Sequence, residues 1–199
     1  MESAMGHEDE AARQHRFETE ALPHLDALYR TALRLTRNRS DAEDLVQETY
    51  LRAYRFWERY EADTNCKAWL YKILTNLRIN QAVKAGKRPA EVDFDEVSAV
   101  LAQSKSEALE LPTQGEIDVF ADLLEDEVKA ALEAVPEDFR LALILHVVEG
   151  FAYKEIAQIL DVPIGTVMSR LYRARKLLQT SLHAHARQRG LVKDDRDDL

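Results

Sequence analysis

The sequence predicts an all-α protein made of two small helical domains joined by an acidic linker. Leu, Ala, Glu and Arg dominate, whereas the chain has 6 glycines and no segment that alternates valine or isoleucine between hairpin turns. Apolar residues make up 46% of the 199 residues, which is enough to build hydrophobic cores. They recur at helical spacing in two stretches with a polar stretch between them, so we expect two small domains rather than one large one.

The N-terminal domain is predicted at residues 17–90, after a disordered start at residues 1–16. Helices are expected at about residues 17–37, 41–60 and 67–85. Ser40 and Glu43 are expected to form a capping box at the start of the second helix, and residues 86–89 to end the third. The side chains expected to point inward are Leu25, Leu28, Tyr29, Ala32, Leu35, Ala42, Val46, Thr49, Ala53, Phe56, Trp69, Leu70, Ile73, Leu74 and Leu77.

The second domain is predicted at residues 126–184, beyond an acidic linker at residues 91–125 and before a polar tail at residues 185–199. Pro112, Thr113 and Gly115 interrupt the helical pattern of the linker. Helices of the second domain are expected at about residues 128–134, 136–150, 152–160 and 164–184.

The charge pattern favours nucleic acid as a partner despite the net charge of −9. Residues 64–90 and 162–193 each hold several lysines and arginines and no carboxylate, whereas residues 91–127 are densely acidic. A polyanion follows the local pattern of charge rather than its sum, so two basic blocks flanking an acidic connector suit two DNA-contacting domains. Two solvated helix faces joined by an acidic linker are the alternative.

Composition argues against several functional classes. Cys66 is the single cysteine, which excludes an intramolecular disulfide and a cysteine-based zinc site. Neither a signal peptide nor an apolar stretch near the roughly 20 residues of a membrane span is found, so we expect a cytoplasmic protein without membrane insertion. His183 and His185 lack the i, i+4 spacing of a helical metal site. We expect no enzymatic activity, catalytic residue, metal, cofactor or small-molecule substrate.

A helix-turn-helix is predicted within residues 151–178. A short apolar helix is followed by the turn Asp161-Val162-Pro163 and then by a longer basic helix. At about 100° per residue, Val167, Leu171, Ala174 and Leu178 fall on the buried side of that helix. The opposite face is expected to read base edges and phosphates, with Arg173 suited to a bidentate contact with guanine. The DNA-binding candidates are Gly165, Thr166, Met168, Ser169, Tyr172, Arg173 and Lys176.

Two further patterns in the N-terminal domain indicate partners. The expected outer face of the second helix carries Asp44, Gln47, Glu48 and Leu51, and an exposed leucine among carboxylates is a weak docking signal. Residues 54–72 interleave aromatic rings with cations, a mixture that suits single-stranded DNA. We interpret Phe56, Trp57 and Trp69 as core residues, and Tyr60 as the better candidate for a base contact.

Four motifs, taken together and in order, resemble the extracytoplasmic-function sigma factors of the sigma-70 family. They are DAEDLVQETYL at residues 41–51, KAWLYKILTN at 67–76, EGFAYKEIA at 149–157 and PIGTVMSRL at 163–171. The helix-turn-helix alone would be less specific, because response regulators share a similar one. Within the family the chain resembles the subgroup that answers thiol-oxidative stress through a redox-sensing anti-sigma factor. Asp161 departs from the family pattern, which often has glycine there, but aspartate tolerates left-handed backbone geometry.

The resemblance implies that the two domains are sigma regions 2 and 4. Region 2 would bind the clamp helices of the polymerase β′ subunit through Asp44, Gln47, Glu48 and Leu51. It would recognise and melt the −10 element through Tyr60, Asn65, Lys72 and Asn76. Region 4 would bind the −35 element, with Ser169, Tyr172 and Arg173 reading bases, and would contact the β flap. The implied partners are core RNA polymerase, promoter DNA and an anti-sigma factor.

The implied function is that of an alternative sigma factor in a stress response, and two other classes stay open. A polymerase-independent helix-turn-helix regulator would bind an operator by itself. A helical interaction protein without a DNA function would be unaffected by Arg173→Ala. Cys66 invites a redox-sensor interpretation, but a lone cysteine beside a core helix is more often inert.

Overall fold

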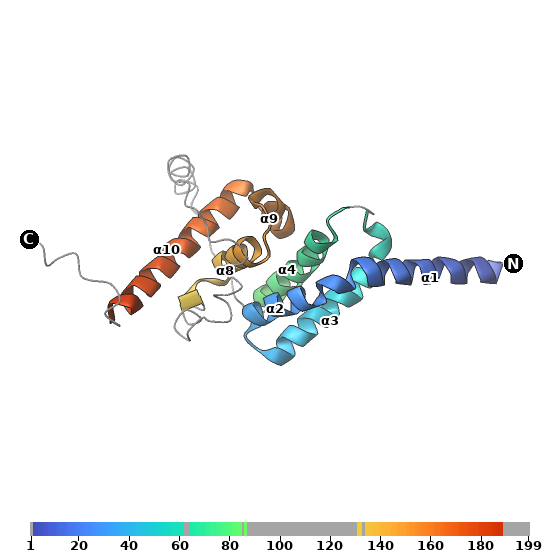
Figure 1. The fold of residues 1–199 in the computed structure, drawn as a ribbon, viewed down its shortest axis with the longest axis horizontal. Helices are drawn as coiled ribbons and strands as arrows, with labels where there is room; N and C mark the ends of the chain where they lie inside the picture. The colour runs from blue at the N-terminus through green and yellow to red at the C-terminus, as the bar shows by residue number, and fades with distance from the viewer. Residues whose placement is uncertain (1, 62–63, 85, 87–130, 133, 189–199) are drawn as a thin grey trace, which may run out of the picture. The chain divides into compact units, whose positions relative to one another are not determined.

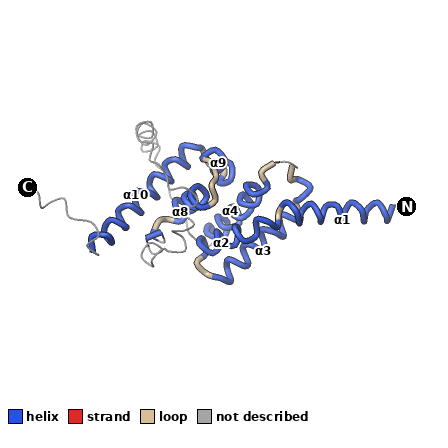
Figure 2. Tube along the Cα trace, in the orientation of Figure 1, coloured by secondary structure: helices blue, strands red, loops and turns tan. Residues whose placement is uncertain are grey.

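The structure is a computed structural model that describes residues 2–61, 64–84, 86, 131–132 and 134–188. The described residues form helices joined by short turns and contain no strand, which confirms the predicted all-α fold (Figures 1 and 2). They belong to two compact units, one containing α1 to α4 and the other mainly α8 to α10. The predicted linker at residues 91–125 lies outside the described residues, as do residues 128–130 of an expected helix and residues 189–199 of the expected tail.

The first unit is a bundle in which α3 packs against both α2 and α4. Its elements are α1 (Glu2–Glu20), the 3-10 turn η1 (Leu22–His24), α2 (Leu25–Thr36), α3 (Arg39–Arg55), the 3-10 turn η2 (Trp57–Arg59) and α4 (Cys66–Lys84).

Two helix boundaries in this unit differ from the prediction. The expected helix at residues 17–37 is interrupted by η1, because Pro23 lies at the start of that turn and cannot donate a backbone hydrogen bond. The helix α3 is capped by Asn38 rather than by Ser40. The Asn38 side-chain oxygen accepts a hydrogen bond from the Asp41 amide at 3.2 Å, and Ser40 lies one residue inside the helix. The cap therefore follows directly on Arg37, whose left-handed backbone (φ 60°) ends α2.

The expectation of disorder at residues 1–16 does not hold for residues 2–16, which belong to α1. Phe17 is buried and packs edge-to-face against Tyr50, Tyr54 and Trp57, with ring centroids 6.1, 5.1 and 5.0 Å away. One turn earlier, Arg13 donates a 2.7 Å hydrogen bond to the Tyr54 carbonyl. These contacts tie the C-terminal half of α1 to the end of α3, although the sequence of α1 is mostly polar.

Most residues predicted to point inward in this unit are buried, namely Leu28, Ala32, Leu35, Ala42, Val46, Thr49, Ala53, Leu70, Leu74 and Leu77. Tyr29, Trp69 and Ile73 are half-buried. Leu25 and Phe56 are wrong, since 41% and 39% of their surfaces are exposed. Because the α-helix gives way to the tighter turn η2, Phe56 faces solvent while Trp57 enters the core at 2% exposure.

The second unit contains α8 (Glu137–Leu143), the π-helical turn η3 (Ile144–Val148), α9 (Tyr153–Leu160) and α10 (Ile164–Gln188). The helix predicted at residues 136–150 is thus α-helical only in its first half. Gly150 follows it in a left-handed conformation (φ 76°), which a glycine adopts without steric cost. The long helix α10 packs against α8, and it extends past the predicted end at residue 184.

Candidate promoter-DNA interface

The helix-turn-helix consists of α9, a turn at residues 161–163 and α10. Asp161 has a left-handed backbone (φ 53°), as predicted for an aspartate at a position where similar helix-turn-helix motifs often have glycine. The Val162 amide donates to the Ala157 carbonyl at 3.1 Å, which closes the turn against the end of α9. Val167, Leu171 and Ala174 are at most 1% exposed and Leu178 is half-buried, which confirms most of the predicted buried side of α10.

The outer face of α10 differs from the predicted one. Ser169 was expected at its centre but is 0% exposed, and its hydroxyl donates to the Thr166 carbonyl at 3.0 Å. The Arg173 guanidinium lies over the Phe139 ring of α8, 5.7 Å from its centroid. Because Ser169 is buried and Arg173 contacts α8, the exposed arc of α10 is narrower than predicted and turned toward Tyr172, which is 37% exposed.

The remaining −35 candidates lie on or near this exposed arc. Lys176 is exposed one turn after Tyr172, and Met168 is half-exposed one turn before it. Gly165 and Thr166 lie half-exposed in the first turn of α10. The Thr166 amide already donates to the Pro163 carbonyl at 2.9 Å, which removes one of the donors expected to attract phosphate there.

Arg170, which follows Ser169, has a structural role. It is 9% exposed, and one of its terminal nitrogens lies 3.8 Å from an Asp138 carboxylate oxygen on α8. Burial lowers the pKa of the Arg170 guanidinium, and the charge of Asp138 opposes that shift. This ion pair holds the recognition helix against α8 rather than facing a ligand.

Tyr60, the predicted base contact of the first unit, is in the core. Its ring is 6% exposed and stacks on Trp57 at 4.7 Å with an interplanar angle of 26°. Its hydroxyl donates to the Thr64 carbonyl at 2.8 Å. In this conformation the ring therefore presents no open face to a base. Phe56, which sequence reasoning had assigned to the core, is exposed with the Arg59 guanidinium 4.9 Å from its ring centroid.

The other −10 candidates belong to α4 and the residue before it. Lys72 and Asn76 are exposed and one turn apart, so they share one face of the helix. Asn65 is exposed, and its side-chain oxygen accepts a 3.0 Å hydrogen bond from the Ala68 amide, which caps α4. Asn65 therefore positions the helix that carries Lys72 and Asn76.

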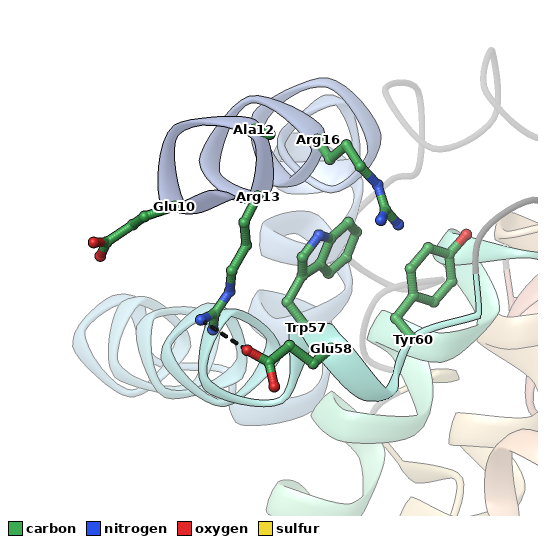
Figure 3. Close-up of a pocket in the computed structure, with 7 residues that line it drawn as sticks. All are labelled: Glu10, Ala12, Arg13, Arg16, Trp57, Glu58 and Tyr60. Atoms are coloured by element: carbon green, nitrogen blue, oxygen red, sulfur yellow. Dashed lines mark hydrogen bonds and ion pairs between the residues drawn. The ribbon is translucent and has the colours of Figure 1, made fainter. Parts of the chain in front are cut away.

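A hollow of about 530 Å³ lies between α1 and η2, and Figure 3 shows the side chains around it. From α1, Arg13 reaches toward Glu58 and Arg16 toward Trp57. The Arg13 guanidinium is 3.4 Å from a Glu58 carboxylate oxygen, and the Arg16 guanidinium lies over the Trp57 ring at 5.8 Å. With Glu10 and Glu58 beside the two arginines, this hollow has mixed charge and is not a distinct anion site.

The predicted polymerase-binding residues share the outer face of α3. Asp44, Gln47 and Leu51 are exposed, and Leu51, at 63%, is the most exposed large apolar residue among those described. Glu48 is half-buried and accepts a 2.6 Å hydrogen bond from Arg52. An apolar side chain this open, surrounded by polar groups, is consistent with a docking surface.

Three further features of the described residues bear on functions other than DNA binding. No group of histidine, cysteine, aspartate and glutamate residues there could hold a metal ion. No helix within the described ranges is long and apolar enough to cross a membrane. Cys66 is 8% exposed, and burial, followed by the charge of Glu20, raises the pKa of its thiol to about 11. A thiol with so high a pKa is a poor nucleophile at neutral pH.

The sequence matches two family models and several characterised proteins. The model described as Sigma-70 region 2 matches residues 22–88, and that described as Sigma-70, region 4 matches residues 125–178. The ECF RNA polymerase sigma factor SigE of Mycolicibacterium smegmatis is 36% identical over 188 residues, which are 93% of this chain and 65% of that protein. The ECF RNA polymerase sigma-E factors of Salmonella typhimurium and Escherichia coli are each 34% identical over 142 residues, which cover 71% of this chain and 74% of theirs.

A solved structure also resembles this chain. It is the sigma factor RpoE of Bartonella quintana in complex with the anti-sigma factor NepR, with a TM-score of 0.62 and 33% sequence identity. The match covers 84% of this chain and 97% of that one. Since the two family models match residues 22–88 and 125–178, and the chain covers 74% of sigma-E factors to which it is 34% identical, the chain belongs to the extracytoplasmic-function sigma factors of the sigma-70 family.

Proposed function

We propose that this chain is an alternative sigma factor that binds core RNA polymerase, directs promoter-specific initiation and is controlled by an anti-sigma factor. The observation that carries the proposal is that one chain holds a region 2 unit and a region 4 helix-turn-helix unit. The mechanism consists of binding alone: polymerase holds both units while each contacts its own promoter element.

Region 4 would recognise the −35 element through the exposed arc of α10. A recognition helix presents its outer side chains to the major groove, where base edges carry a distinct pattern of donors and acceptors. Met168, Tyr172 and Lys176 are the side chains that support this role best, because they lie on the exposed arc. Arg173 would have to leave Phe139 to reach a base.

Region 2 would bind the unpaired strand of the −10 element. Lys72 and Asn76 combine a cation with an amide on one exposed face of α4, which suits a phosphate and a base edge. Removing a base from its stack costs a few kcal/mol, so these contacts must offset that cost. Phe56 adds an exposed ring on which a base could stack, whereas Tyr60 would first have to leave Trp57.

The outer face of α3 would dock on the clamp helices of the β′ subunit. Leu51 would be covered by the partner, and Asp44 and Gln47 would contribute polar contacts around it. We assign the β flap as a second polymerase contact for region 4 on the family resemblance alone.

Control by an anti-sigma factor agrees with the Bartonella relative, whose structure was solved with the anti-sigma factor NepR. We further propose, from the sequence motifs alone, that the chain belongs to the subgroup that responds to thiol-oxidative stress. The buried Cys66, with its raised thiol pKa, then supports sensing by the partner rather than by this chain.

The test is in vitro transcription from a promoter library with purified core polymerase and the full chain. We expect initiation at defined start sites that share a −35 and a −10 sequence. Asn76→Ala should change the selected −10 sequence and leave the −35 sequence unchanged. If polymerase and this chain never initiate at a defined site, the proposal is wrong. Tight operator binding without polymerase would instead support a helix-turn-helix regulator.

A further inference from the structure

Arg175 is a basic residue of α10 that is not among the residues proposed to contact bases. It follows Met168 by seven residues and Tyr172 by three, which places it on the exposed arc of the helix. It is half-exposed, whereas Arg170 is buried in its ion pair with Asp138. This position gives Arg175 access to DNA that is bound along the arc.

The Arg175 side chain is held by a residue of α9. Its terminal Nη2 donates a 3.2 Å hydrogen bond to the Tyr153 hydroxyl, 22 residues earlier in the chain. Among the described residues no carboxylate pairs with Arg175, and its Nε is buried without a hydrogen-bond partner. A guanidinium has five N–H donors. One is used here and the Nε donor is buried, so the charge and the other three donors are left for an anion.

Tyr153 is itself fixed in place from the other side. Its ring packs edge-to-face on His146, with centroids 4.8 Å apart, and His146 Nδ1 donates to the Phe151 carbonyl at 2.9 Å. Because the Tyr153 hydroxyl oxygen accepts from Arg175, its own proton is free to be donated, and no described residue accepts it. The Tyr153 hydroxyl and the Arg175 guanidinium can thus both donate hydrogen bonds to one bound anion.

We propose that Arg175 and the Tyr153 hydroxyl bind one phosphate of the DNA backbone at the −35 element, with Tyr153 as the residue that positions the guanidinium. In a helix-turn-helix the first helix crosses the backbone while the second enters the major groove, and this pair joins those two helices. A phosphate contact sets the register of the protein on DNA and carries no base preference. The inference rests on the proposed sigma-factor function and adds a contact to it.

The test uses holoenzyme made from the full chain and core polymerase, with fluorescence anisotropy on two labelled duplexes. One duplex carries the selected −35 sequence and the other a scrambled one, and each is titrated across a series of salt concentrations. For Arg175→Gln we expect affinity for both duplexes to fall roughly ten-fold, with their ratio unchanged. The slope of log affinity against log salt should fall by about 0.9, the value for one phosphate.

Three further variants separate positioning from folding. Arg175→Lys should keep the salt slope because it keeps the charge. Tyr153→Phe keeps the ring on His146 and should lower affinity about three-fold without changing the unfolding temperature. Arg30→Gln makes the same charge change at an exposed residue of α2 and should alter neither affinity nor slope.

The result that would refute the phosphate contact differs from the result that would refute the proposed sigma-factor function. If the native holoenzyme prefers the −35 duplex and Arg175→Gln matches it in affinity and slope, the phosphate contact is refuted while the sigma function stands. A lower unfolding temperature with an unchanged slope would assign Arg175 a structural role and also refute the contact. If the native holoenzyme shows no preference between the duplexes, the proposed −35 recognition fails first.

Discussion

Phe17→Ala tests whether α1 is part of the folded first unit. Phe17 is 7% exposed and contacts the rings of Tyr50, Tyr54 and Trp57 at centroid distances of 5.0 to 6.1 Å. Replacing a buried phenylalanine by alanine typically costs about 3–5 kcal/mol. Phe17 belongs to a single helix at the edge of the bundle, so we expect the unfolding free energy to fall by about 3 kcal/mol, the lower end of this range. In a unit of this size that corresponds to a fall of roughly 12 °C or more in the unfolding temperature.

The assay is urea unfolding of the full chain followed by tryptophan fluorescence. The chain has 2 tryptophans, Trp57 and Trp69, and both lie in the first unit, so the signal reports on that unit alone. Thr19→Ala is the matched control, because Thr19 is exposed on the same helix and its hydroxyl bonds only to carbonyls of α1. A loss below about 0.5 kcal/mol for Phe17→Ala, equal to that of the control, would mean that the N-terminal residues do not pack on the bundle.

Three other predictions concern the exposure of Leu51, Tyr172 and Cys66. Leu51→Ala should weaken binding to core polymerase by about ten-fold without lowering stability. The control is Leu33→Ala, at a residue of α2 that is 39% exposed, and it should leave binding unchanged. Equal binding of both variants in a pull-down titration would exclude Leu51 from the docking surface. Tyr172→Ala should change the −35 sequence selected from a library, because Tyr172 is exposed. Ser169→Ala should leave the selected sequence unchanged, because Ser169 is buried. The reverse result would show that the exposed arc is assigned wrongly. The pKa of the Cys66 thiol is raised to about 11, so about one part in a thousand should be thiolate at pH 8. Labelling by a thiol reagent should therefore be slow and should become faster as the pH rises. Complete labelling within minutes at neutral pH would contradict the burial of Cys66.

Local sequence determined the helices and the turn between α9 and α10. The spacing of Val167, Leu171 and Ala174 identified the buried side of the recognition helix, since a helical period depends only on the order of residues. Asp161 could be assigned to a left-handed turn because its short side chain tolerates that backbone. The all-α class and the family followed from such patterns and motifs.

Tertiary packing decided which outward side chains are available. A helical wheel places Ser169 opposite the core, but it carries no information about the neighbours of α10, and in the structure Ser169 is 0% exposed. In the same way, the polar sequence of α1 gave little sign that Phe17 would close a cluster of rings from α3 and η2. Exposure depends on contacts between residues far apart in the chain, so Tyr60 and Ser169 were misplaced. Leu25 and Phe56 were misplaced too, although most other residues of their periodic stripes are buried.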